Sequence, residues 1–209
     1  MNNYIVFDCE TGGLDPEKNP ITEIALIAFQ GEDFKEIGRY ETFIQPYGTD
    51  PVYEPKALEM TGITMDMINS GKEHKQFIKE LITWFKSVKR RGRNLPVMIA
   101  HNAIFDQGML DFAFHTANKN LYEFVDPIFI DTLHLSRLKD ADKSKHNLKA
   151  ACERFGIEIV NAHRAMDDVE ATKQFIVQYF SSVRHANASL FEDASDITVP
   201  TYREQFKFG

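Results

Sequence analysis

Two acidic residues follow a short apolar run in the segment FDCETGGL, Phe7 to Leu14. Side chains alternate between the two faces of a strand, so Asp8 and Glu10 are expected to point to the same side. Neighbouring carboxylates repel each other unless a cation lies between them, and oxygen ligands of this kind suit a hard divalent metal ion. The alternative is that the strand has already reached solvent and that both acids are simply hydrated.

A second segment, HNAIFDQGML, begins at His101 and places an acid on the apolar side of a predicted helix. Asp106 shares a helical stripe with Leu110 and Phe114, which predicts that its carboxylate points inward. Two simpler interpretations exist: Asp106 only complements the positive end of the helix dipole, and Asn102 is only a helix cap.

A third segment, HRAMDDVEAT, starts at His163 and offers two adjacent acids. Asp168 aligns with Phe175 on the apolar stripe, whereas Asp167 aligns with polar residues, so Asp168 is predicted to face inward. His163 lies in the loop before this helix, where an imidazole could exchange protons near neutral pH. Because unpaired buried charge is costly, the four inward acids of the three segments are expected to share metal ions.

The elements that must position these residues form two groups. Strands are expected at 4–7, 21–29, 37–44, 97–100 and 128–130, and helices at 73–89, 103–116, 132–138, 148–155 and 165–180. The first three strands have short links and suggest an antiparallel meander. The later alternation of strand and helix implies right-handed crossovers and parallel strands. We therefore predict an α/β fold with a mixed five-stranded sheet flanked by helices.

Composition limits the class of protein. The 209 residues are 43% hydrophobic and 26% charged, which is typical of a globular domain. No spanning segment or secretory signal is apparent, and the two cysteines form no metal-binding pair, so we expect a cytoplasmic protein. The formal net charge of −7 argues against nucleic-acid binding through a broad basic surface. Bound divalent cations would reverse the local field at an acidic site.

The C-terminal segment differs in composition from the rest. We expect residues 1–180 to form the main domain and residues 181–209 to form a tail. Tyr202, Phe206 and Phe208 in this tail are candidate aromatic anchors for a protein partner such as a polymerase or a clamp. The alternative is that the tail packs back on its own domain.

Together the three segments resemble, in order and spacing, the three motifs of the DEDDh exonuclease family, which includes RNase T and the proofreading subunits of bacterial replicative polymerases. The resemblance covers about Tyr4 to Phe180. It implies an RNase H-like fold, two Mg²⁺ or Mn²⁺ ions and removal of nucleotides from 3' ends as nucleoside 5'-monophosphates. Two such ions about 3.5 to 4 Å apart can serve both the attacking and the leaving oxygen of an in-line displacement.

The resemblance also assigns individual residues. The catalytic and metal-binding acids are matched by Asp8, Glu10, Asp106 and Asp168, and His163 matches the general base. The pocket for the 3'-terminal nucleotide is matched by Thr11, Gly12, Leu14, Met60 and Thr61, to which we add His101 and Asn102 as candidate substrate contacts. The family commonly has a second threonine where this chain has Gly12.

Three functions are consistent with these features. The leading one is a DNA 3'-5' exonuclease in proofreading, repair or processing, acting on single strands or frayed duplex ends. The second is an exoribonuclease of the same fold, since only tolerance of the 2'-hydroxyl separates the two. The third is a catalytically silent nucleic-acid-binding module, which the complete set of acids and histidine disfavours.

Overall fold

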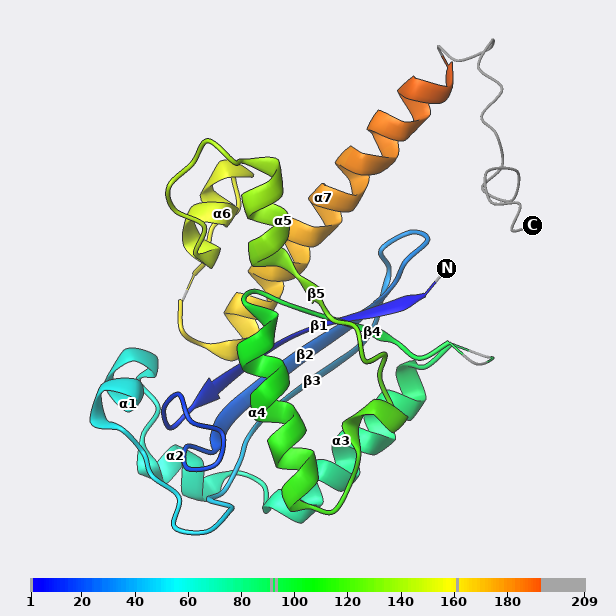
Figure 1. The fold of residues 1–209 in the computed structure, drawn as a ribbon. Helices are drawn as coiled ribbons and strands as arrows, with labels where there is room; N and C mark the ends of the chain where they lie inside the picture. Colours follow the sequence, from blue (N-terminus) through cyan, green and yellow to red (C-terminus); the bar gives the residue numbers. More distant parts are fainter. Residues whose placement is uncertain (1, 91, 93, 161, 193–209) are drawn as a thin grey trace, which may run out of the picture. The chain divides into compact units, whose positions relative to one another are not determined.

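The computed structural model of the protein describes residues 2–90, 92, 94–160 and 162–192. These residues form a five-stranded sheet in the order β3-β2-β1-β4-β5 (Figure 1). Its strands are β1 (Asn3–Thr11), β2 (Ile21–Gln30), β3 (Glu36–Phe43), β4 (Val97–Ala100) and β5 (Ile130–Asp131). β1 and β2 pair antiparallel, as do β2 and β3, whereas β1–β4 and β4–β5 are parallel. The predicted RNase H-like mixed sheet, with three antiparallel strands followed by two parallel ones, is confirmed.

The central position of β1 and β2 explains why their sequences are so apolar. Nine of the ten residues of β2 are buried, because both faces of this strand are covered. In the register of the sheet, Asp8 lies opposite Ala25 and Glu10 lies opposite Glu23. The acids of the first motif therefore lie on the central strand, at the end that pairs with β2 and extends beyond the last residue paired with β4.

The described residues also form helices. They are α1 (Pro55–Thr61), α2 (Met65–Ser70), α3 (His74–Val88), α4 (Ala103–Thr116), the short 3-10 helix η1 (Leu121–Glu123), α5 (Thr132–Lys139), α6 (Leu148–Arg154) and α7 (Ala165–Glu192). α4 crosses the sheet in Figure 1 and contacts β1, β2, β4 and β5.

Helices α3 and α4 share one hydrophobic core with β1. Phe85 of α3 and Phe114 of α4 are fully buried in the same cluster as Ile5 and Phe7 of β1. Burial of each such side chain contributes about 1.5 to 3 kcal/mol. This packing holds α4 against the strand that carries Asp8 and Glu10.

Three predicted boundaries were wrong. β1 continues to Thr11 rather than ending at Phe7, so Asp8 and Glu10 lie within the strand. β5 is only Ile130–Asp131, because the backbone N–H of Ile128 is bonded to the Asp126 side chain in a turn and the Ile128 side chain is 76% exposed. α7 continues to Glu192 rather than ending near residue 180. Two helices were also missed, because α1 and α2 lie between residues 44 and 73, where neither a helix nor a strand was predicted.

The chain divides into two compact units, Met1–Ile176 and Val177–Gly209. The first holds the whole sheet and every candidate site residue. The predicted aromatic anchors Tyr202, Phe206 and Phe208 lie outside the described residues. In the described part of the chain, no helix is long and apolar enough to cross a membrane.

Candidate active site

Three carboxylates from two elements meet at one point. Asp8 and Glu10 of β1 and Asp168 of α7 each offer an oxygen atom, and these atoms lie within 4.8 Å of one another. All three side chains are partly buried. The strand alternation and the helical stripe thus bring together three of the four predicted acids.

The fourth acid, Asp106, lies beside this group rather than within it. It is only 3% exposed in the first turn of α4, and its stripe partners Leu110 and Phe114 are fully buried. Its Oδ1 accepts a hydrogen bond of 3.0 Å from the backbone N–H of Cys9, between the two strand acids. The carboxylate is therefore held next to Asp8.

His163 and Asp168 are joined by a local hydrogen bond at the start of α7. The backbone N–H of His163 donates to Oδ2 of Asp168 at 3.2 Å, and the N–H of Asp168 donates to the Arg164 carbonyl at 3.1 Å. His163 has φ = +69°, a left-handed conformation that is strained for a residue with a side chain. Its side chain is exposed.

The electrostatics of the acids match a site for hard cations. Burial, together with the charge of Asp106, raises the pKa of Asp8 well above its usual range, and burial raises the pKa of Glu10 to about 7. The pKa of Asp106 is raised by burial to about 8, and that of Asp168 is also raised, chiefly by burial. Among the described residues, none of the four takes part in an ion pair. Carboxylate oxygens without a paired cationic side chain fit a hard divalent cation.

This arrangement predicts how stability depends on pH. Because the folded pKa values of Glu10 and Asp106 are raised, the folded state binds more protons, and the resulting stability is lost as the pH rises through about 7 to 8. We expect the thermal unfolding midpoint in EDTA to fall between about pH 6 and pH 9. Mn²⁺ should raise the midpoint more at the higher pH, because the ligands must be deprotonated.

Thermal unfolding with and without Mn²⁺ at the two pH values tests this prediction. Asp106→Asn should flatten the pH dependence measured in EDTA. A metal-induced shift that is the same at both pH values would contradict the assignment of these acids as ligands.

A cavity of about 370 Å³ opens beside the acids. Its lining contains Glu10 and His163 together with four of the predicted substrate-pocket residues, Thr11, Leu14, Met60 and Thr61. Leu14 is 79% exposed and Met60 is 54% exposed, so both offer apolar surface at its rim. An apolar surface beside acidic ligands suits a nucleobase next to a phosphate.

Gly12 is not among the described residues that line this cavity. Its backbone is instead hydrogen-bonded to two other segments of the chain. Its N–H donates to the Pro20 carbonyl at 2.9 Å, and its own carbonyl accepts from the N–H of Glu54 at 2.7 Å, just before α1. A Cβ atom here would lie 2.7 Å from the Val52 carbonyl oxygen. The close approach explains why glycine replaces the family's usual threonine, and contact of its backbone with substrate stays a prediction.

His101 and Asn102 also lie outside this cavity. The ring of His101 is hydrogen-bonded at both nitrogens, to the Thr132 hydroxyl at 3.0 Å and the His146 carbonyl at 2.8 Å. Asn102 occupies the cap position of α4 with φ = +68°, and its side chain makes no capping bond. Their predicted contact with substrate remains untested.

Sequence analysis missed two groups of residues at the site. Glu23, only 1% exposed, is paired with Arg164 directly beside Glu10. Cavity-lining residues form the second group, which consists of Cys9, Gly13, Glu54, Lys56, Ala57 and Phe105. The presence of an acid within the apolar run of β2 could have identified Glu23 as unusual. No sequence pattern near Glu23 identifies Arg164 as its partner.

Comparisons with known proteins agree with this geometry. A family model described as an exonuclease, RNase T, matches residues 5–175. The PolC-type DNA polymerase III of Halalkalibacterium halodurans is 35% identical over 171 residues, and that of Bacillus subtilis (strain 168) is 32% identical over 178 residues. These matches cover 82% and 84% of this chain but only 11% of each polymerase.

Solved structures show the same fold. Exonuclease I of E. coli in complex with a dT13 oligonucleotide superposes with a TM-score of 0.74 at 22% identity, covering 91% of this chain and 44% of that one. Its zinc-bound complex with single-stranded DNA gives a TM-score of 0.76, also at 22% identity, covering 92% of this chain and 43% of that one.

Proposed function

The chain belongs to the DEDDh family of exonucleases, and from this premise we propose that it is a metal-dependent enzyme that removes nucleotides from the 3' ends of DNA. The observation that supports this most is the meeting of Asp8, Glu10 and Asp168 within 4.8 Å, at the edge of a cavity that also contains His163. The products would be nucleoside 5'-monophosphates.

The metal ions would be held by Asp8, Glu10, Asp106 and Asp168. Bound there, two divalent ions would stabilise the charge on the attacking and leaving oxygens of the phosphodiester. The acids do not act as proton carriers in this scheme, because metal binding requires their deprotonated forms.

His163 would serve as the general base. Its exposed side chain lines the cavity next to Glu10, so the imidazole would take a proton from the attacking water as the water oxygen bonds to phosphorus. The bond from phosphorus to the 3'-oxygen of the preceding nucleotide would break in the same step, and that oxygen would take up a proton from solvent. The backbone hydrogen bond from His163 to Asp168 links the base to a proposed ligand in the first turns of α7. Leu14 and Met60 would hold the terminal base by apolar contact.

The choice of DNA over RNA rests on the relatives. The matched regions belong to proteins named as DNA polymerases, and the solved neighbours hold DNA oligonucleotides. In this proposal the chain trims single-stranded or frayed 3' ends in proofreading, repair or processing. A polymerase or clamp partner for the tail from residue 181 onward belongs to the same proposal.

One assay tests the function. Oligonucleotides labelled at the 5' end, as single-stranded DNA, duplex DNA and RNA, are incubated with enzyme and Mg²⁺, with EDTA as the control. We expect a ladder shortening from the 3' end, with single-stranded DNA cleaved fastest. Faster cleavage of RNA would favour the exoribonuclease alternative, and absence of any ladder would favour a binding module.

The proposed domain boundary has its own test. If residues 1–180 are the catalytic domain, truncation after Phe180 should retain the nuclease ladder, because every candidate site residue belongs to the unit Met1–Ile176. Circular dichroism would verify that the truncated chain folds. Loss of folding would show that the tail packs on the domain.

A further inference from the structure

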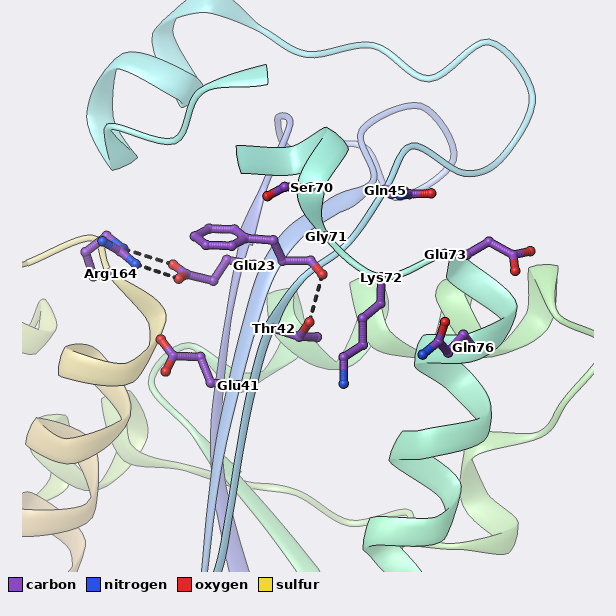
Figure 2. A pocket seen from close by; sticks show the side chains of 11 residues that line it. Glu23, Glu41, Thr42, Gln45, Ser70, Gly71, Lys72, Glu73, Gln76 and Arg164 are labelled. Atoms are coloured by element: carbon purple, nitrogen blue, oxygen red, sulfur yellow. Dashed lines mark hydrogen bonds and ion pairs between the residues drawn. The ribbon is translucent and has the colours of Figure 1, made fainter. Parts of the chain in front are cut away.

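An ion pair between a buried carboxylate and a partly exposed guanidinium lies one residue away from the proposed base. Arg164 donates from Nη2 to Oε1 of Glu23 at 2.9 Å and from Nε to Oε2 at 3.2 Å (Figure 2). The Glu23 side chain is only 1% exposed, whereas that of Arg164 is 39% exposed and borders an open cavity of about 720 Å³. The guanidinium also lies 5.8 Å from the centre of the Phe43 ring. Two hydrogen bonds to Glu23 and a cation–π contact with Phe43 therefore fix the position of the Arg164 guanidinium.

The same carboxylate holds the start of α7. Oε2 of Glu23 accepts a third hydrogen bond, of 3.3 Å, from the backbone N–H of Ala165, the first residue of that helix. The first N–H groups of a helix have no partner within it, and a negative charge at this end is favourable. Glu23 thus acts as a capping group supplied by a distant strand.

This arrangement connects the two elements that carry the catalytic residues. Glu23 is the register partner of Glu10 across β1 and β2. Arg164 directly follows His163, whose left-handed backbone needs support from its surroundings. A chain of contacts therefore runs from the strand of Glu10, through Glu23, to the loop of His163.

We propose that Glu23 and Arg164 are positioning residues that hold His163 in place over the site. The inference rests on the proposed function, because it assigns them to act through the general base. Arg164 has a second effect, because its positive charge compensates the negative charge of Glu23. Without Arg164, Glu23 would be a fifth uncompensated carboxylate beside Glu10. Lysine cannot replace it fully, because an ammonium group lacks the planar pair of donors that matches a carboxylate.

The structure supplies a matched control. Arg39 of β3 also joins the sheet to α7. Its Nη1 donates to Oε1 of Glu170 at 2.6 Å and lies 3.7 Å from Sδ of Met166, and its carboxylate partner is exposed and lies more than one turn after His163. A general loss of sheet–helix contact would affect both arginines. A role in positioning His163 would affect Arg164 alone.

The experiment measures kcat, KM and thermal unfolding of the full-length chain on single-stranded DNA. We expect Arg164→Met to lower kcat by about 10- to 100-fold with little change in KM. Arg39→Met should keep the wild-type kcat, and Arg164→Lys should recover part of the loss. In a His163→Ala background, Arg164→Met should cost much less, because the residue that it positions is gone.

Removing Arg164 leaves the buried Glu23 carboxylate without its ion-pair partner, which is destabilising, so a second variant is needed if Arg164→Met does not fold. Glu23→Gln with Arg164→Met removes both charges and should reproduce the loss of kcat. An unchanged kcat in both variants, or an equal loss with and without His163, would overturn the proposal. If His163→Ala itself is fully active, the proposed base assignment fails; if only Arg164→Met is fully active, the positioning role alone fails.

Discussion

Replacing Asp8 by asparagine is expected to abolish nuclease activity while making the metal-free protein more stable. The Asp8 carboxylate lies among the other acids of the site. Burial and the negative charges of Asp106, Glu10 and Asp168 all raise its pKa. Without metal, removing its charge relieves this repulsion. With metal, the protein loses a central ligand, and the rate should fall by more than the roughly 10²- to 10⁴-fold typical of losing a general base.

Thermal unfolding in EDTA and the rate in Mg²⁺ should therefore change in opposite directions. The matched control is Asp33→Asn in the loop between β2 and β3, where the carboxylate only accepts a local bond from the Lys35 N–H. That variant should leave both quantities near the wild-type values. An Asp8→Asn enzyme with full activity would defeat the metal-site assignment.

Replacing His163 by alanine is expected to lower kcat by about 10²- to 10⁴-fold, the usual cost of losing a general base. The side chain is exposed, and the link to Asp168 uses the backbone N–H, which alanine retains. Stabilisation by Mn²⁺ should therefore stay close to that of the wild type. The variant separates proton transfer from metal binding.

His115→Ala is the corresponding control, because His115 is exposed in the last turn of α4. It should be fully active. Loss of Mn²⁺ stabilisation in His163→Ala would mean that the histidine supports the ligands rather than acting as a base.

Much of the fold follows from hydrophobic periodicity. The amphipathic stripe that predicts a helix over residues 73–89 corresponds to α3 at His74–Val88, and the apolar run at residues 21–29 corresponds to β2. The short helices α1 and α2 could not be predicted this way. α1 buries none of its residues, so it has no apolar stripe, and its start is marked only by Pro55 and its end by the left-handed Gly62.

The same distinction applies to the site. The inward direction of Asp8, Glu10, Asp106 and Asp168 could be predicted from strand alternation and from the apolar stripes of the helices. Both patterns depend only on residues nearby in the sequence. The pair between Glu23 and Arg164 joins residues 141 positions apart, and no local pattern encodes it.

Direct titration with Mn²⁺ tests the central claim that these carboxylates form a metal centre. Full-length wild-type protein, Asp168→Asn and Asp167→Asn are compared, with the free ion followed by electron paramagnetic resonance. The account predicts that wild type and Asp167→Asn bind Mn²⁺ with the same affinity and have the same nuclease activity. Asp168→Asn should bind Mn²⁺ much more weakly. Equal Mn²⁺ binding by Asp168→Asn and wild type would contradict it.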